Sequence, residues 1–513
     1  PMRQSLWRRY YLDLGLVALC LVGYYELGQF GGASTRAELG GGGANPLLLA
    51  SPALLLLAGA LVVLRLVPVA AALGERVAAR GRGITSVLAF AQVERSPNRY
   101  TRMTLLLVLS VGLGLFALTF DASLGQNVRD RAAYATGADI RTIQNSAEAG
   151  ALNERLSGQI KQLPGAQAIT AVYRTQASTS LDEGDLSLDM LAIDPDTFGA
   201  IAGPVSWRAD YADHSLDSLL GQMRAHLHGQ TAGTPGAPIW ALISQSYAET
   251  QHLKVGDRFA LMVSGNSFAL TSFVVGDIVR EFPTLYPQLR SGGFLVTPYS
   301  DVLADVTRET PETVSTFGPN EFWLNVSSPA AQPALIKALN AKASALDISS
   351  LDVLSSNLAT AQANPVSAGM RGLLLVGALT AALLAILGSI VQSVLAARQR
   401  TTQFAILRTI GMANRQITGL LLGEQIVVYL FGLIGGTVLG LLLTSATLPF
   451  LQFSDTTVDT TKLGIPPYQL IFNPHNIAIF YAALVVAFVI ALVIAARYAA
   501  TIGLGKALRL GED

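Results

Sequence analysis

Cysteine and charge are both scarce in this chain of 513 residues. The single cysteine, Cys20, excludes a disulfide within the chain. Charged residues make up 14% of the sequence, whereas an ordinary globular protein carries about 25%. Basic and acidic residues balance at 35 each, so no overall field attracts nucleic acid, and no nucleic-acid partner is expected. Hydrophobic residues reach 51%, which indicates a membrane protein.

Patterns typical of catalysis are also lacking. The polar stretch 124–368 holds four of the five histidines, and two of them, His226 and His228, are spaced so that they do not share a helix face. The sequence has no G-x-S-x-G nucleophile motif and no G-x-x-x-x-G-K-[ST] phosphate loop. We therefore expect no catalytic, cofactor-binding or metal-binding residue in this chain.

Long apolar runs are what the sequence has instead. About 20 mainly apolar residues are needed to span a bilayer as a helix. Six runs meet this condition, and together they predict a membrane α-helical protein of six transmembrane helices: 11–30, 47–73, 103–123, 371–396, 417–446 and 476–501.

The basic residues predict the orientation of these helices, because cytoplasmic loops carry an excess of lysine and arginine. Basic residues cluster before the first run, between the second and third, between the fourth and fifth, and after the last. The alternate loops are nearly free of them: 31–46 has only Arg36, and 447–475 has only Lys462. Both termini are therefore expected in the cytoplasm, and the polar stretch 124–368 outside.

The stretch 124–368 predicts a large α+β extracytoplasmic domain. The third helix is expected to continue through 127–134 until Gly137 ends it. Alternating or apolar segments predict strands at 138–144, 167–175, 187–193, 238–243, 257–263, 268–279, 293–297 and 321–326. Amphipathic segments predict helices at 149–162, 213–227, 244–252 and 332–345. We expect two lobes, one built from both ends of this stretch and one from its strand-rich middle, with 346–369 forming a stalk.

The fifth run carries two features of helix packing. Gly432, Gly436 and Gly440 recur every four residues, which places them on one helix face where another backbone can approach closely. Glu424 lies deep in the same run, where a carboxylate is costly unless it is paired or protonated. A hydrogen bond between packed helices is the favoured interpretation of Glu424, and a role in transport is the alternative.

The loop 398–415 between the fourth and fifth runs predicts a short amphipathic helix. Phe404, Leu407 and Arg408 fall on one face, and Gly411 ends the helix. From the residues alone, two functions are equally compatible with this pattern: the helix lies on anionic lipid, or it docks into a partner protein.

This loop resembles a motif of the FtsX/MacB-type ABC transporter permease family, R-x-R-x-x-E-F-A-[IL]-L-R-[AT]-[IL]-G. The matching residues are Arg398, Arg400, Phe404, Ala405, Ile406, Leu407, Arg408, Thr409, Ile410 and Gly411, and the later matches are Arg415, Ile417, Glu424 and the glycines Gly432 to Gly440. Gln403 stands where the family usually has an acidic residue. Weaker similarity extends over about 85–510.

The resemblance implies a permease that works with a separate cytoplasmic ABC ATPase, which hydrolyses ATP as two copies. It also implies that the loop couples the two proteins through Arg400, Gln403, Phe404, Ala405, Leu407, Arg408 and Gly411. Other implied partners are a second permease half, covalent or separate, and an extracytoplasmic protein, lipoprotein or peptide. The implied location is the bacterial inner membrane.

The resemblance also organises the chain. It assigns a linker transmembrane hairpin to 1–80, a cytoplasmic amphipathic lead-in to 81–102, a core helix to 103–123, the extracytoplasmic domain to 124–368 and three core helices to 369–513. The first two helices look like the pair that joins the halves of ten-helix permeases, so this chain is expected to be the C-terminal half of such a protein. A membrane receptor or scaffold whose basic loops bind lipid is the competing function. A secondary transporter would need polar or broken helices at mid-membrane, which only Glu424 and the glycines offer.

Overall fold

The structure is a computed structural model of the chain. It describes residues 46–80, 84–95, 97–145, 151–179, 187–227, 237–264, 268–286, 292–309, 318–363, 365–399, 414–447 and 465–501. The chain divides into two compact units. The helical unit comprises Pro1–Gln126, Pro365–Thr456 and Tyr468–Asp513. The sheet unit comprises Asn127–Asn364 and Thr457–Pro467.

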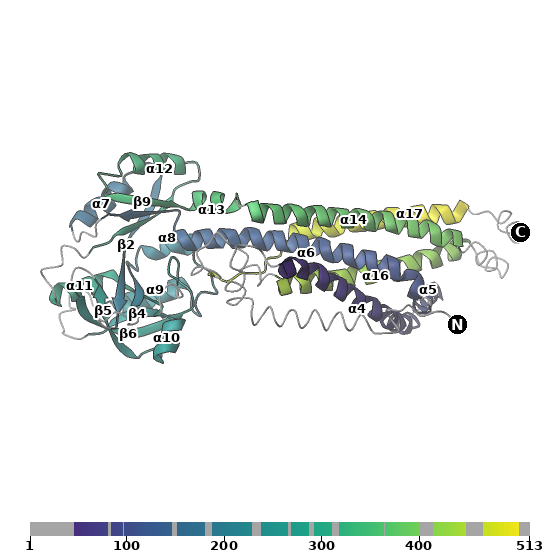
Figure 1. Cartoon of the computed structure of the whole chain (residues 1–513), viewed down its shortest axis with the longest axis horizontal. Helices are drawn as coiled ribbons and strands as arrows, with labels where there is room; N and C mark the ends of the chain where they lie inside the picture. Colours follow the sequence, from purple (N-terminus) through teal and green to yellow (C-terminus); the bar gives the residue numbers. More distant parts are fainter. Residues whose placement is uncertain are drawn as a thin grey trace, which may run out of the picture. The chain divides into compact units, whose positions relative to one another are not determined.

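Long helices make up the described part of the helical unit (Figure 1). They are α4 (Pro46–Ala78), α5 (Ile84–Arg95), α6 (Pro97–Thr136), α14 (Pro365–Gln399), α16 (Asn414–Thr447) and α17 (Pro474–Thr501). Five of them, all except α5, are long and apolar enough to cross a membrane. They lie at five of the six apolar runs predicted from the sequence. The first predicted run, 11–30, lies outside the described residues.

Helix α6 extends well beyond its apolar run, as the sequence predicts. It continues to Thr136, and its last ten residues, from Asn127, belong to the sheet unit. Gly137 ends it with φ at +82°, a left-handed conformation that favours glycine. A Cβ at Gly137 would also lie 2.6 Å from the Trp323 ring, so the close packing requires glycine for a second reason.

The described residues of the sheet unit form nine strands. They are β1 (Ile140–Gln144), β2 (Ala166–Ser178), β3 (Ser187–Ile193), β4 (Ile239–Ser244), β5 (Arg258–Ser264), β6 (Phe268–Val279), β7 (Phe294–Pro298), β8 (Glu321–Val326) and β9 (Ile348–Val353). All eight predicted strands are confirmed. The helices of this unit are α7 (Ala151–Lys161), α8 (Phe198–Val205), α9 (Leu216–Ala225), α10 (Gln245–Gln251), α11 (Tyr299–Glu309), α12 (Gln332–Ala341) and α13 (Leu354–Gln362).

Six of the strands close into a ring. The pairings run β2–β3, β3–β7, β7–β4, β4–β6 and β6–β5, and β5 returns to β2 at Ala177 and Ser178. One cluster of buried side chains draws members from all six strands, among them Met190, Ile243 and Phe273. Because side chains alternate between the two faces of a strand, only the inner face of a closed ring brings all six together. This cluster is therefore the interior of the ring.

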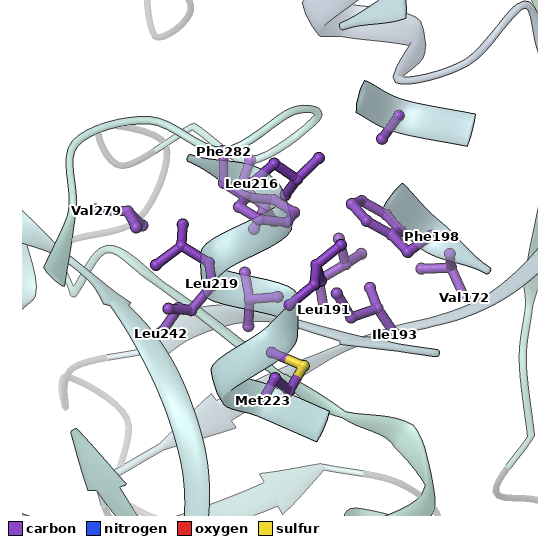
Figure 2. Packing of buried hydrophobic residues seen from close by; sticks show 14 of the residues in the cluster. Val172, Leu191, Ile193, Phe198, Leu216, Leu219, Met223, Leu242, Val279 and Phe282 are labelled. Carbon is purple, nitrogen blue, oxygen red and sulfur yellow. The ribbon is translucent and has the colours of Figure 1, made fainter. Parts of the chain in front are cut away.

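The opposite face of the ring packs against α8 and α9. Leu191 of β3 and Leu242 of β4 point this way, one residue out of phase with the interior side chains, and contact the cluster that includes Phe198 of α8 and Leu219 of α9. Figure 2 shows these side chains gathered around α9. Ser215 begins α9 because its hydroxyl accepts the main-chain N–H of Ser218, which satisfies one of the donors at the helix start.

A second, four-stranded sheet shares β2 with the ring. The first half of β2 pairs with β8, β8 pairs with β1, and β1 pairs with β9, all antiparallel. Helices α7 and α12 cover it through Ile160, Leu335 and their neighbours. The two lobes are therefore built from the predicted parts of the chain. The four-stranded sheet comes mainly from both ends of the stretch 124–368, and the ring comes mainly from its middle. In Figure 1, α7, α12 and β9 lie on one side of β2, and β4, β5 and β6 on the other.

The expectation of a stalk over 346–369 was wrong. Its first part is β9, the edge strand beside β1, followed by the short helix α13, and α14 already begins at Pro365. An edge strand needs few apolar residues, and in β9 only Ile348 and Val353 are buried. Their spacing gives no alternation that a sequence pattern could detect. The short helices α8 and α11 were also not predicted.

Candidate functional site in the membrane helices

The predicted coupling residues lie outside the described part of the chain. Arg400, Gln403, Phe404, Ala405, Leu407, Arg408 and Gly411 fall between the end of α14 at Gln399 and the start of α16 at Asn414. The helices that flank this loop are described, and their packing defines the candidate site.

The three predicted packing glycines of α16 all lie against α6. A Cβ added to Gly432 would lie 2.6 Å from the Cβ of Leu107, and one added to Gly436 would lie 2.5 Å from the Cβ of Val111. At Gly440 the added atom would lie 2.9 Å from the main-chain oxygen of Gly112. Real Cβ atoms do not approach other atoms this closely, so each glycine allows the α6 backbone to come nearer than any other residue would. We call this contact the α6–α16 seam.

Helix α6 supplies a matching small residue that the sequence analysis missed. A Cβ on Gly112 would lie 3.4 Å from the main-chain oxygen of Gly436, so the two helices approach through glycine on both sides. The signal for Gly112 was present, since a glycine inside an apolar helical run costs about 1 kcal/mol relative to alanine and usually has a packing reason.

Threonine hydroxyls continue the seam beyond the glycines. The Oγ1 atoms of Thr119 on α6 and Thr444 on α16 lie 2.7 Å apart, and both residues are fully buried. Each hydroxyl is also within hydrogen-bond distance of a carbonyl in its own helix, Leu115 for Thr119 and Gly440 for Thr444. Hydrogen bonds of this kind between membrane helices contribute about 0.6 kcal/mol on average. The pair fixes the register of the two helices more than it adds stability.

Glu424 lies at the other end of the seam. It is 3% exposed, and its Oε2 accepts the hydroxyl of Tyr100, near the start of α6, at 2.7 Å. Burial of an ionised carboxylate is costly unless donors surround it, and the tyrosine hydroxyl is one such donor. This is the interhelical hydrogen bond that the sequence analysis favoured over a role in transport.

Helix α5, which lies in the predicted lead-in 81–102, packs beside this end of the seam. A Cβ on Gly423 of α16 would lie 3.3 Å from the Cβ of Ala89, and one on Gly74 of α4 would lie 2.5 Å from the Phe90 ring. Ala89 and Val93 are buried. Helix α5 therefore contacts both α4 and α16, and its contact at Gly423 lies near the start of α16.

Helix α6 is the central helix of this unit. In its most apolar stretch 72% of the residues are buried, against 44% in α16, 17% in α17 and 6% in α14. Its contacts with α14 include a hydrogen bond of 2.6 Å from the Ser110 hydroxyl to the Ala381 carbonyl and an ion pair of 3.5 Å between Arg371 and Asp121. Leucine and valine side chains stand exposed along α14, among them Leu379, Leu383 and Val391. Exposed apolar side chains on a helix of this length are typical of a surface that faces lipid or another membrane helix.

The described residues hold no group of three or more histidine, cysteine, aspartate or glutamate side chains that could bind a metal ion. Glycine contacts, one threonine pair and one buried carboxylate join α6 and α16.

Comparisons with known proteins find a family match in part of this helical region. Residues 375–504 match the family described as FtsX-like permease C-terminal. The comparison with curated proteins finds no match. Among solved structures, the extracellular domain of the noncanonic ABC-type transporter YknZ from Gram-positive bacteria is 11% identical, with a TM-score of 0.23; the match covers 40% of this chain and 95% of that one. A domain of a putative permease protein from Porphyromonas gingivalis is 14% identical, with a TM-score of 0.23, over 41% of this chain and 82% of that one.

The family match includes the whole of α16, with Glu424 and the three seam glycines, and the loop whose motif carried the resemblance in the sequence. Residues 375–504 of this membrane protein are therefore similar to the C-terminal domain of FtsX-like permeases.

Proposed function

We propose that this chain is the permease subunit of an ABC transporter. It transmits motion driven by ATP in a separate cytoplasmic ATPase to the sheet unit, which acts outside the cytoplasm in export, extraction or signalling. The observation that carries the proposal is the FtsX-like permease match over residues 375–504, together with the α6–α16 seam inside it. The chain has no phosphate loop of its own, so the ATP-binding site belongs to the partner.

The proposal includes a topology of six membrane helices with both termini in the cytoplasm. The described helices α4, α6, α14, α16 and α17 supply five spans by length and composition. The run 11–30 supplies the sixth. The alternation of basic and neutral loops supports an orientation in which the sheet unit lies outside the cytoplasm. The membrane we propose is the inner membrane of a bacterium.

The partners follow from the same family. A pair of ATPase subunits binds the loop 398–415, and a second permease half completes the membrane part. An extracytoplasmic protein, lipoprotein or peptide is the partner of the sheet unit. In this arrangement α5 and the loop receive the motion of the ATPase, and the seam makes α6 move with α16, because glycine contacts leave no soft side chains between the two backbones.

A pull-down in detergent tests the proposal. If Phe404 and Leu407 insert into a groove of the ATPase and Arg408 pairs with an acidic residue there, truncating such anchors costs roughly 2 kcal/mol each, or about thirtyfold in affinity. Phe404→Ala combined with Arg408→Ala should therefore lose the ATPase that the unmodified chain retains. Thr402→Ala, in the same loop, is the matched control and should retain it.

The competing function, a scaffold whose basic loop binds anionic lipid, predicts the reverse result. In that case the double variant keeps any ATPase in detergent, and only its affinity for anionic vesicles falls, with a further fall at high salt. An ATPase retained equally by the double variant and the unmodified chain would remove the loop as the coupling site.

A further inference from the structure

The last turn of α6 is hydrogen-bonded to a short segment of the sheet unit, residues 280–286, which we call the strap. Tyr134 of α6 is fully buried. Its main-chain oxygen accepts the N–H of Thr284 at 2.8 Å, and its hydroxyl oxygen accepts the N–H of Phe282 at 3.3 Å. The same hydroxyl donates to the Leu285 carbonyl. One residue of α6 therefore holds the strap by both its backbone and its side chain.

The strap also reaches the four-stranded sheet, through Thr284. This residue has φ at +68°, which is unusual for a β-branched side chain, and it is buried. Arg174 of β2 donates to its side-chain oxygen at 2.5 Å and to its carbonyl at 3.3 Å. The rare backbone conformation thus presents two oxygens of one residue to a single guanidinium group.

Arg174 is in turn held by an ion pair with a buried carboxylate. Its Nε lies 2.6 Å from Oε1 of Glu321 on β8, and the indole N–H of Trp323 donates to Oε2 of the same carboxylate at 2.9 Å. Glu321 is 3% exposed. Removing one partner of such a pair leaves a buried charge unpaired, so the positions of Arg174 and Glu321 are strongly linked. A continuous set of hydrogen bonds therefore runs from α6 through Thr284 to β2 and β8.

The start of the strap continues directly from β6, which belongs to the ring. The main-chain N–H groups of Arg280 and Glu281 both donate to the Tyr211 carbonyl, at 2.8 and 3.2 Å. The Tyr211 ring meets the Tyr134 ring edge to face at 5.6 Å. Arg208 makes a second contact with α6, an ion pair with Asp130 at 3.0 Å. Its guanidinium group also donates to the Pro467 carbonyl at 2.9 Å. The strap is thus continuous in the chain with strand β6 of the ring, and it is hydrogen-bonded to the other sheet through Thr284 and Arg174.

We propose that the strap is the element that couples α6 to both parts of the sheet unit. Displacement of the α6 end is passed to the ring through β6 and to the four-stranded sheet through Thr284, Arg174 and Glu321. The inference rests on the proposed function for the source of the motion, and it names the residues that carry that motion onward. The physical basis is that a packed, hydrogen-bonded contact moves as one body, whereas a solvated linker would absorb the displacement.

The first experiment needs no ATPase. Hydrogen exchange is measured in the full chain in nanodiscs, for the unmodified protein and for Arg174→Met combined with Glu321→Gln, which removes both charges together. Neither residue lies on α6. The strap predicts that exchange at Thr284 and in the last turn of α6 speeds up by about tenfold or more, because the hydrogen bond from Thr284 to Tyr134 opens with the loss of Arg174.

The matched control is Thr170→Val, which breaks the 2.7 Å hydrogen bond between Thr170 of β2 and Thr197, away from the strap. It should leave exchange in α6 unchanged. If the double variant also leaves exchange at Thr284 and α6 unchanged while the sheet unit stays folded, the strap is not a coupling element and the inference fails.

The second experiment adds the ATPase and compares Tyr134→Phe with Tyr173→Phe. Both remove one hydroxyl from a buried tyrosine, but Tyr173 packs in the ring interior against Tyr299. Without vanadate, Tyr134→Phe should hydrolyse ATP at the rate of the unmodified protein. With ATP and vanadate, which trap the ATPase, it should show at most about half of the change in exchange of β1 and β8, whereas Tyr173→Phe should show the full change. A full change in Tyr134→Phe overturns the inference. If no ATPase binds the unmodified chain, the proposed function fails, and the first experiment alone decides on the strap.

Discussion

Gly112 of α6 and Gly440 of α16 approach so closely that a Cβ on Gly440 would lie 2.9 Å from the Gly112 main-chain oxygen. The neighbouring glycine, Gly436, is equally confined, with Val111 at 2.5 Å and the Val108 carbonyl oxygen at 3.0 Å from the position of an added Cβ. The second of these is a backbone atom, which cannot rotate aside as a side chain can. The seam therefore tolerates no side chain at Gly436.

The first prediction concerns this position. Gly436→Leu should separate α6 from α16 and reduce the yield of folded protein strongly, since overpacking a close contact costs about 1–3 kcal/mol or more. The matched control is Gly419→Leu on the same helix, where no atom of the described residues lies within 4 Å of an added Cβ. Size-exclusion profiles in detergent compare the two. Equal yields of Gly436→Leu and Gly419→Leu would show that α6 and α16 are not in close contact.

The seam also shows how far sequence reasoning extends in a membrane region. The spacing of Gly432, Gly436 and Gly440 revealed a packing face, because a period of four on a helix defines a face without reference to a partner. It could not reveal that the partner is α6. Every other membrane helix is also apolar, and contact between helices depends on their arrangement in space. Gly112 alone carries no period, so its role appeared only in the structure.

The sheet unit likewise contains some elements that the sequence pattern predicts and others that it does not. Eight strands were predictable because their segments are alternating or apolar. Strand β1 alternates between buried and half-buried residues, and β4 and β7 are buried throughout. Strand β9 was not predictable, since its position depends on pairing with β1, about 200 residues earlier in the chain. The residues around the strap were missed for a different reason. Arg174, Thr284 and Glu321 are far apart in the sequence, and no short motif links a buried arginine with its carboxylate.

The second prediction concerns Glu424 and Tyr100. Tyr100→Phe removes the hydroxyl that donates to Glu424 at 2.7 Å and should lower stability by about 0.5–2 kcal/mol. In a Glu424→Met background the same change should cost much less, because the acceptor is gone. Thermal unfolding in detergent measures all four proteins of this cycle. Thr380→Val is the control, since its hydroxyl bonds carbonyls of its own helix. Fully additive effects would contradict a direct interaction between Tyr100 and Glu424.

The third prediction concerns topology. The background variant is Cys20→Ser, which removes the single natural cysteine. Ser218 is exposed in the sheet unit, and Thr402 lies in the basic loop. An impermeant thiol reagent should label Ser218→Cys in intact cells, after the outer membrane is permeabilised where one is present, and should label Thr402→Cys only after the inner membrane is opened. Labelling of Thr402→Cys in intact cells would contradict the proposed orientation.

The fourth prediction concerns Glu281, the acidic residue of the strap. Burial raises the pKa of this carboxyl from 4.5 to about 7. The Tyr134 hydroxyl, at 3.3 Å, and the Arg208 charge lower the pKa, and the Asp210 charge raises it. In the unfolded chain the carboxyl returns to its ordinary pKa. Between pH 4.5 and about 7 the folded protein therefore holds a proton that the unfolded chain has released.

It follows that this residue's contribution to stability is greatest below pH 4.5 and declines as the pH rises, until the decline is complete above about pH 7. Glu281→Gln keeps a neutral side chain at every pH and removes the dependence. At pH 8 the variant should be more stable than the unmodified chain by about 1–2 kcal/mol, a value reduced because the carboxyl is partly exposed to solvent. At pH 4.5 the two should be nearly equal.

Thermal unfolding followed by tryptophan fluorescence measures this difference, since Trp207, Trp240 and Trp323 all lie in the sheet unit. Glu249→Gln is the control, because Glu249 is exposed on α10 and the same substitution there leaves the buried cluster untouched. A stabilisation at pH 8 that is absent at pH 4.5 and absent from the control supports a buried, protonated Glu281 against Tyr134. Identical pH profiles for Glu281→Gln and the unmodified chain would mean that the carboxyl is solvated, and that the strap holds α6 without a titrating group.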